Sequence, residues 1–274
     1  MLALGSGRRC GVLGHPIAHS LSPVMHRAAY DWLGLDWSYD AFDVDEAGLP
    51  GFVAGLDVSW RGLSLTMPLK RAVLTLLDEV SVTAREAGAA NTVILEAGRL
   101  SGDNTDVPGI VAALAERGVT RVRSATVLGG GATAESLLLA LRRVGLASVT
   151  LQVREPARAE ALAARASAAG VGVTVGRLGD KSPSVDVVAS TVPAAAVADS
   201  AGRLAAQGDA VFDAIYDPWP TPLAEHGASL SRTVVTGIDL LAHQAVLQLR
   251  SMTGHDVPVD VVRNPALAAI GFGA

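Results

Sequence analysis

Residues 125–134 read Ala-Thr-Val-Leu-Gly-Gly-Gly-Ala-Thr-Ala, and this stretch decides the fold of the 274-residue chain. Its first four residues are apolar or β-branched and predict a short buried strand. The three glycines predict a tight turn, and residues 132–144 carry apolar side chains at helical spacing. A strand, a glycine turn and a helix in this order are typical of α/β proteins.

The chain after this helix continues as short β-branched segments that are separated by Ala-rich segments. The predicted strands are residues 149–153, 171–175, 185–189, 210–215 and 233–235. Parallel strands that helices cover on both faces have this composition. We therefore expect a doubly wound parallel sheet in this part of the chain.

A second α/β unit is predicted before the glycine turn. Strands are expected at residues 10–13, 37–42 and 62–65, and a hairpin at residues 91–95 and 100–103 on the sheet edge. Helices are expected from Pro23 to Trp32, from Pro68 to Glu79, and from Asp106 with Pro108. A long helix over residues 237–250 is placed back against this first unit.

Composition excludes several classes of protein. The 22 basic and 27 acidic residues give a net charge of −5, and aromatic residues make up 4% of the chain. A nucleic-acid-binding surface is therefore not expected. The single cysteine, Cys10, cannot form an internal disulfide, and no apolar run approaches the roughly 20 residues of a membrane span. We expect a soluble cytoplasmic protein.

The glycine turn follows the spacing G-x-G-x-x-A and predicts a dinucleotide site at the start of the following helix. The other interpretation is an ordinary strand-to-helix turn. The candidate cofactor contacts are Gly129, Gly130, Gly131, Ala132, Thr133 and Ala134.

Arg154, Glu155 and Arg158 lie about twenty residues later, after a predicted strand. An acidic residue there suits the ribose 2′-hydroxyl of NAD, whereas arginine suits the 2′-phosphate of NADP. Two cations favour NADP because a guanidinium pairs with phosphate through two hydrogen bonds. Glu155 would repel that phosphate and leaves NAD open, and all three could be plain surface residues.

Lys70 and Asp106 are the candidate acid–base pair. With Pro68 at the first helical position, Lys70 would lie in the opening turn, where the helix dipole disfavours a cation unless a partner compensates. The carboxylate of Asp106 could be that partner, or it could cap the helix before Pro108. A nicotinamide enzyme needs such a group to exchange a proton with the substrate oxygen.

Ser20 and Ser22 precede Pro23, so Ser22 suits a helix N-cap, although two hydroxyls and free N–H groups also suit a small carboxylate. Asn91 could bond a substrate hydroxyl or close a turn. Gln244 lies one helical turn before Gln248 and could face a cleft or solvent. No metal is expected, because no Cys or carboxylate cluster joins His15, His19 and His26.

Together these strings resemble the shikimate dehydrogenase family, which reduces 3-dehydroshikimate to shikimate with NADPH. The match runs in order over nearly the whole chain. The matching strings are Gly14-His15-Pro16-Ile17-Ala18-His19-Ser20-Leu21-Ser22-Pro23, Thr66-Met67-Pro68-Leu69-Lys70, Ala90-Asn91-Thr92, Asn104-Thr105-Asp106, residues 129–134, and residues 237–244.

The resemblance implies a substrate domain of residues 1–106 and 237–274 and an inserted Rossmann-type NADP domain of residues 107–236, with the active site in the cleft between them. It implies that Ser20 and Ser22 hold the substrate carboxylate and that Lys70 and Asp106 act as the catalytic pair. The implied contacts to ring oxygens are Thr66, Asn91 and Gln244, and Gly237 is implied near the nicotinamide. The implied place in metabolism is aromatic amino acid biosynthesis.

Three departures from the family pattern concern specificity. Ser64 stands where the family usually has Asn, which alters one substrate contact. Residues 153–155 replace Asn-Arg-Thr, and residues 190–193, with Thr191 as a candidate cofactor contact, replace Asn-Ala-Thr-Pro. A quinate or aminoshikimate dehydrogenase using NAD, or a silent sensor that binds NADP and a ring acid, stays open. The oligomeric state, a monomer or a homodimer, also stays open.

Overall fold

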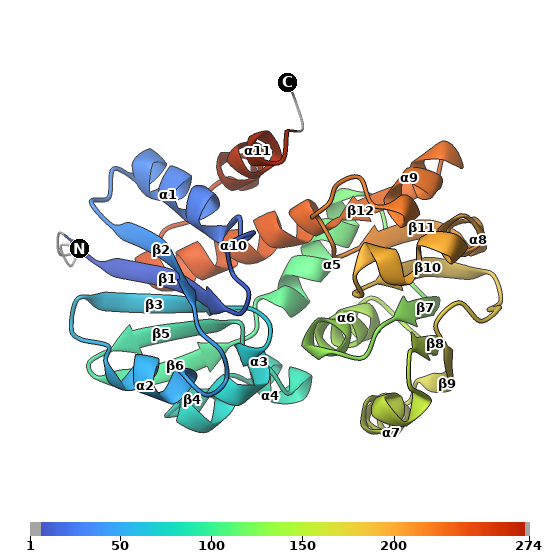
Figure 1. The fold of residues 1–274 in the computed structure, drawn as a ribbon, viewed down its shortest axis with the longest axis horizontal. Helices are drawn as coiled ribbons and strands as arrows, with labels where there is room; N and C mark the ends of the chain where they lie inside the picture. The colour runs from blue at the N-terminus through green and yellow to red at the C-terminus, as the bar shows by residue number, and fades with distance from the viewer. Residues whose placement is uncertain (1–6, 272–274) are drawn as a thin grey trace. The chain divides into compact units, whose positions relative to one another are not determined.

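The computed structural model describes residues 7–271, which form two compact units. Unit 1 is drawn from Met1–Gly109 and Leu241–Ala274, and unit 2 is Ile110–Leu240. Each unit contains one six-stranded sheet with helices packed on it (Figure 1). The predicted α/β class is confirmed.

The sheet of unit 1 has the order β2-β1-β3-β5-β6-β4. Strand β1 runs parallel to β2 and β3, whereas β5 is antiparallel to both β3 and β6. The predicted hairpin is therefore present, but it does not form the edge, because the short β4 pairs with β6. The strands are β1 Arg9–Gly14, β2 Ser38–Asp43, β3 Trp60–Leu65, β4 Glu79–Val80, β5 Thr92–Glu96 and β6 Arg99–Asp103.

The helix predicted from Pro68 to Glu79 is shorter than expected. The segment forms a single α turn followed by a 3-10 turn, and Glu79 lies in β4. Pairing of β4 with β6 overrides the local helical pattern there. The helical segments of unit 1 are α1 Ser22–Leu33, α2 Leu49–Ala54, α3 Leu69–Ala72, η1 Val73–Leu76, α4 Val82–Ala87 and α11 Val259–Ala269. Helix α5, Asp106–Glu116, begins in unit 1, and α10, Gly237–Thr253, enters it at Leu241.

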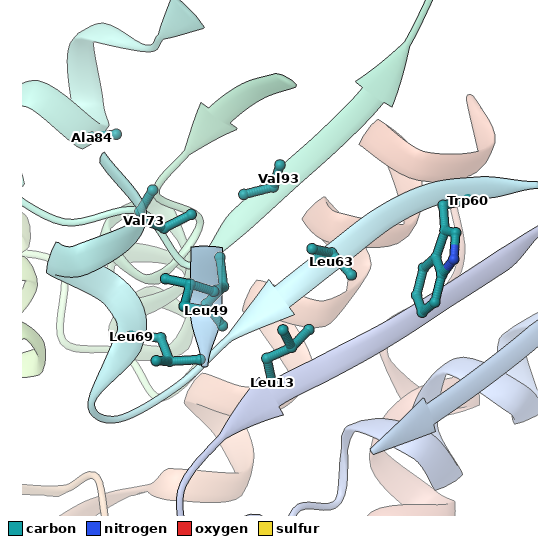
Figure 2. Close-up of a cluster of buried hydrophobic side chains, with 10 residues drawn as sticks. Leu13, Leu49, Trp60, Leu63, Leu69, Val73, Ala84 and Val93 are labelled. Atoms are coloured by element: carbon teal, nitrogen blue, oxygen red, sulfur yellow. The ribbon is translucent and has the colours of Figure 1, made fainter. Parts of the chain in front are cut away.

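A buried apolar cluster fixes α2, α3 and α4 on the sheet of unit 1. Figure 2 shows Leu13, Leu63 and Val93 from the strands beside Leu49 and Leu69 from the helices. Burying one such side chain contributes about 1.5–3 kcal/mol. Because Leu69 is fully buried, this packing also fixes the turn that carries the next residue, Lys70.

The sheet of unit 2 has the order β12-β11-β10-β7-β8-β9, and all of its pairs are parallel. The predicted doubly wound sheet is therefore confirmed. The strand order reverses at β7, and ligands of such sheets bind at this switch point, where the glycine turn begins. The strands are β7 Ser124–Leu128, β8 Ser148–Val153, β9 Gly172–Arg177, β10 Val185–Ser190, β11 Gly208–Asp213 and β12 Thr233–Thr236.

The helices of unit 2 bury small and branched side chains against this sheet. Leu128, Val188 and Val211 from the strands pack with Leu204 of α8 and Leu223 of α9. The helical segments are α6 Ala132–Arg143, η2 Pro156–Ala159, α7 Glu160–Ala168, η3 Ala194–Ala196, η4 Ala198–Ser200, α8 Ala201–Gln207 and α9 Pro222–Ser229. Within residues 7–271, none of the helices has the length and apolar character that crossing a membrane requires.

Candidate active site

Lys70 and Asp106 form an ion pair in unit 1. Lys70 Nζ lies 2.6 Å from Asp106 Oδ2, and the two side chains are 13% and 7% exposed. Because α3 is a single turn, its dipole opposes the ammonium far less than a long helix would. The compensating partner expected for Lys70 is this buried carboxylate.

Asp106 does not cap α5. Asp106 is the first helical residue, and the side chain of Asn104, two residues earlier, accepts a hydrogen bond from the N–H of Val107 in the first turn at 3.2 Å. The carboxylate of Asp106 is therefore available for side chains: Oδ2 meets Lys70, and Oδ1 accepts from Asn91 Nδ2 at 2.8 Å. Two donors from different elements hold its orientation.

Asn91 has its full hydrogen-bonding capacity in use. The backbone N–H of Thr105 donates to Oδ1 at 2.8 Å, which fixes the direction of the amide because an N–H can only donate. Both hydrogens of Nδ2 then go to Asp106 Oδ1 and to Gln244 Oε1, the latter at 3.1 Å. Asn91 is buried and orders its neighbours rather than closing a turn.

Gln244 and Gln248 of α10 both point into unit 1 and not to solvent. Close approach at Gly109 allows this for Gln244, since a Cβ on Gly109 would lie 3.0 Å from the backbone nitrogen of Gln244. Gln244 Oε1 accepts from Asn91, and its Nε2 donates to the carbonyl of Leu241 at 3.1 Å. Among residues 7–271, one N–H of Gln244 has no partner.

Ser64 lies in a buried cluster that composition and spacing did not reveal. Its Oγ is 2.6 Å from the hydroxyl of Tyr39 and 2.8 Å from Gln248 Oε1. His26 stacks on Tyr39 with ring centroids 4.0 Å apart, and its Nε2 faces Gln248 Oε1. Burial lowers the pKa of His26 to about 3, so its imidazole is neutral at physiological pH.

The hydroxyls before α1 are arranged differently from the predicted N-cap. Leu21 is the N-cap and Ser22 is the first helical residue, so Ser22 does not cap the helix with its side chain. The N–H of Ser22 instead faces Ser20 Oγ at 3.4 Å. Thr66 follows β3 and lies partly exposed, with its backbone bonded to Leu13 and Leu69.

Two of the three histidines considered as metal ligands, His15 and His26, have side-chain partners within unit 1. His15 Nδ1 lies 2.6 Å from Asp43 Oδ1, and this hydrogen bond raises the pKa of the exposed imidazole. His26 belongs to the buried cluster around Gln248. Within residues 7–271, no three His, Cys, Asp or Glu side chains are placed to hold a metal ion.

The glycine turn of unit 2 places an open helix N-terminus at the switch point. Gly129 has φ +116°, and a Cβ there would lie 2.3 Å from Thr191 Oγ1, which donates to the carbonyl of Leu128. Gly131 differs: among the described residues, no heavy atom lies within 4 Å of a Cβ built on it, and no side chain caps α6. Ala134 is fully buried where α6 packs on the sheet.

These residues fit a dinucleotide phosphate on physical grounds. Helix α6 is twelve residues long, and the first N–H groups of a helix have no partner within it. The open space at Gly131 leaves those donors accessible to an anion. The candidate backbone contacts are Gly129, Gly130, Gly131, Ala132, Thr133 and Ala134.

The arginines after β8 are both exposed, but they differ in their partners. Arg158 Nε lies 2.8 Å from Glu155 Oε2, so the acidic residue that would repel a phosphate is already paired. Arg154 makes no ion pair among the residues that the structure describes. Its guanidinium is therefore the freer of the two for a phosphate.

Gly237 has a structural reason to be glycine. A Cβ there would lie 2.4 Å from the carbonyl oxygen of Ala214, in the segment after β11. Asp213, which ends β11, accepts hydrogen bonds from the hydroxyl of Thr221 at 2.6 Å and from the N–H of Ile215. Burial raises the pKa of Asp213 to about 6. Asp213 is the one charged residue within the strand predicted over residues 210–215, and this was the sequence signal for it.

Comparison with known proteins gives one consistent result. The model of the shikimate dehydrogenase substrate binding domain matches residues 12–93, and that of the shikimate 5′-dehydrogenase C-terminal domain matches residues 237–264. Shikimate dehydrogenase (NADP(+)) of Symbiobacterium thermophilum is 36% identical over 97% of this chain and 96% of its own length.

Solved structures agree with the sequence comparison. The crystal structure of Mycobacterium tuberculosis shikimate dehydrogenase is 37% identical, with a TM-score of 0.87 over 95% of this chain and 99% of that chain. Shikimate 5-dehydrogenase of Thermus thermophilus in complex with NADP(H) and shikimate is 35% identical, with a TM-score of 0.83 over 96% and 99% of the two chains. With this identity over nearly its full length, the chain belongs to the shikimate dehydrogenase family.

Proposed function

We propose that this chain is an NADP-dependent shikimate dehydrogenase, which catalyses the reversible reduction of 3-dehydroshikimate to shikimate. The observation that carries the proposal is the buried ion pair of Lys70 and Asp106, at 2.6 Å. An oxidoreductase of this kind needs a positioned group that exchanges a proton with the substrate oxygen. The names of the relatives, which are NADP-dependent shikimate dehydrogenases, support the substrate and the cofactor.

Lys70 is the proton donor in the direction of reduction. Bound NADPH supplies the hydride to the carbonyl carbon. Lys70 Nζ gives a proton to the carbonyl oxygen as negative charge develops there, and in oxidation the same nitrogen takes a proton from the alcohol. Asp106 orients the ammonium and shares its proton, while Asn91 fixes the other carboxylate oxygen.

The substrate contacts are assigned to unit 1. Ser20 and Ser22 hold the carboxylate through hydroxyl and N–H groups near the start of α1. Gln244 offers one unused N–H to a ring oxygen. Thr66 and Ser64 contribute hydroxyls from the end of β3, and Asn91 acts mainly through the groups it orients.

The cofactor contacts are assigned to unit 2. The glycine turn and the N-terminus of α6 hold the pyrophosphate, and Arg154, with Arg158 beside it, holds the 2′-phosphate of NADP. Thr191 shapes the turn by its contact with Gly129, and Gly237 lies near the nicotinamide. The predicted domains, residues 1–106 with 237–274 for the substrate and residues 107–236 for NADP, have boundaries three and four residues before those of the two units, so Gly237 falls in the predicted substrate domain but in unit 2.

One experiment tests the proposal and its alternatives together. Steady-state oxidation of shikimate and of quinate, each with NADP⁺ and with NAD⁺, is followed by cofactor absorbance. We expect the highest kcat/KM for shikimate with NADP⁺. A preference for quinate or for NAD⁺ would replace the proposed substrate or cofactor, and binding without turnover would indicate a sensor.

A further inference from the structure

Gln248 is a buried amide that the proposed mechanism does not use. Its side chain is on the same helix as Gln244 and is 1% exposed. Its Nε2 donates to the backbone carbonyl of Asn91 at 3.1 Å and to Thr92 Oγ1 at 3.0 Å. A carbonyl oxygen can only accept, so this contact fixes which end of the amide faces β5.

The direction of every following hydrogen bond is then determined. Gln248 Oε1 lies 2.8 Å from Ser64 Oγ and can only accept, so Ser64 must give it its single proton. Tyr39, whose hydroxyl is 2.6 Å from Ser64 Oγ, must in turn donate to Ser64. His26 Nε2 also donates to Gln248 Oε1, at 3.3 Å.

The Ser64 hydroxyl can offer a ligand one hydrogen-bonding position. A hydroxyl has one proton and two acceptor positions. The proton and one acceptor position are occupied, and the other acceptor position has no partner in the part of the chain that the structure describes; the side chain is 4% exposed. Gln244 is the opposite case, because its oxygen is taken by Asn91 and it has one N–H to offer.

We infer that Gln248 is a positioning residue that fixes Ser64 as a hydrogen-bond acceptor, so that the substrate group facing Ser64 must be a hydroxyl that donates. This inference rests on the proposed function. A carbonyl, ether or fluorine facing Ser64 would place two hydrogen-bond acceptors next to each other. A buried acceptor without a donor costs free energy of binding. The enzyme would reject such analogues by polarity rather than by size.

Analogues of shikimate in which one ring hydroxyl at a time is replaced by fluorine test the inference. Fluorine can accept weakly but cannot donate. In the wild type, we expect one analogue modified away from the reacting alcohol to lose roughly 100-fold in kcat/KM. Ser64→Ala should lose a similar factor on shikimate itself and little more on that analogue.

Two matched variants separate a positioning role from simple packing. Gln248→Met keeps the length of the side chain but removes the acceptor, so Ser64 can turn its proton towards the ligand, and discrimination between shikimate and the analogue should fall below roughly tenfold. Tyr39→Phe removes a donor to Ser64, but Gln248 Oε1 still accepts the Ser64 proton. Discrimination between shikimate and the analogue should therefore stay near 100-fold, roughly the wild-type value. Circular dichroism checks that both variants fold.

Gln248→Glu provides a readout that a packing role would not produce. A protonated Glu can donate to the carbonyl of Asn91 and accept from Ser64, whereas the ionised form faces that carbonyl with negative charge. Both forms of the carboxyl present an acceptor to Ser64, so discrimination should be retained in Gln248→Glu although it falls in Gln248→Met. Equal discrimination in the wild type and in Gln248→Met, or equal loss in Gln248→Met and Tyr39→Phe, would overturn the inference. Absence of shikimate oxidation by the wild type would instead refute the proposed function.

Discussion

The two candidate regions use opposite means of recognition. In unit 1 the polar side chains around Lys70 are buried and bonded to one another, as Asn91 and Asp106 are. In unit 2 the corresponding region is a backbone turn with open space at Gly131, followed after β8 by Arg154, which has no ion-pair partner in the described part of the chain. Changes of polarity should therefore damage unit 1 most, and changes of shape should damage unit 2 most.

Lys70→Ala should give the largest effect on activity. It removes the proposed proton donor while leaving the other contacts of unit 1 in place, so kcat should fall by about 10²- to 10⁴-fold, with a smaller change in the KM for shikimate. Steady-state kinetics in both directions measure this. Lys181→Ala, a change at the other lysine of the chain, is the matched control and should leave kcat unaltered. A large rise in KM with unchanged kcat would assign Lys70 to binding alone.

Gly129→Ala and Gly131→Ala should separate folding from cofactor binding in unit 2. At Gly129 the added methyl group meets Thr191 at a φ that L-residues rarely adopt, so the variant should lose roughly 2 kcal/mol or more in stability, about 4–8 °C in Tm. At Gly131 the methyl group meets no protein atom, so Tm should hold. It would occupy the space in front of α6, and the KM for NADP⁺ should rise roughly tenfold.

Thermal scans and cofactor titrations of the same two variants decide this prediction. If both glycine variants lost stability equally, the space at Gly131 would serve the fold. If Gly131→Ala left both Tm and the KM for NADP⁺ unaltered, the N-terminus of α6 would not hold the phosphates.

The two units should also respond to pH in opposite directions. His26 in unit 1 has a pKa of about 3 in the folded state, below its ordinary value of 6.5. The neutral imidazole therefore contributes fully to the free energy of unfolding above pH 6.5, and this contribution is lost as the pH falls. Asp213 in unit 2 has a pKa raised to about 6, so stability is highest below its ordinary pKa of 3.8 and is lost as the pH rises to 6.

Urea unfolding at about pH 4.5 and about pH 7.5 measures this opposition. The quantity compared is the free energy of unfolding of each variant minus that of the wild type. For Asp213→Asn this difference should rise by about 2 kcal/mol from the lower to the higher pH. For His26→Gln it should fall by about the same amount. Asp209→Asn, an exposed aspartate in unit 2, serves as the control and should show little pH dependence. Parallel changes in both variants would show that neither group is titrated as its surroundings indicate.

The sequence predicts the parts of the fold that local patterns determine. Apolar runs locate the strands, and the glycine turn locates α6, because these signals lie within a few residues of one another. The helix predicted from Pro68 to Glu79 is wrong beyond Leu76, because Val80 pairs with Gly102, far along the chain. Strand pairing between residues so far apart in the sequence leaves no signal in the residues next to Val80.

The candidate site shows the same limit at the level of single side chains. Lys70 and Asp106 could be proposed as a pair from their residue types, but the expected cap at Ser22 is wrong, and Asp106 is relieved of capping by Asn104. The direction of the Gln248 amide depends on the carbonyl of Asn91, which is 157 residues away in the sequence. Hydrogen-bond direction therefore needs the three-dimensional structure.

Substitutions at Arg154 and its neighbours should change cofactor preference alone and should sharpen the comparison within unit 2; the first of them is Arg154→Ser. The guanidinium is exposed, so its loss should raise the KM for NADP⁺ by about tenfold and leave the KM for NAD⁺ nearly unaltered, since NAD⁺ lacks the 2′-phosphate. Arg158→Ser should act less strongly, because Arg158 is already paired with Glu155. Glu155→Gln should act in the opposite direction, since removing the carboxylate releases Arg158 and lowers the negative potential. If NADP⁺ and NAD⁺ were affected equally by Arg154→Ser, this side chain would contact a part common to both cofactors, and selectivity for the phosphate would lie elsewhere in unit 2.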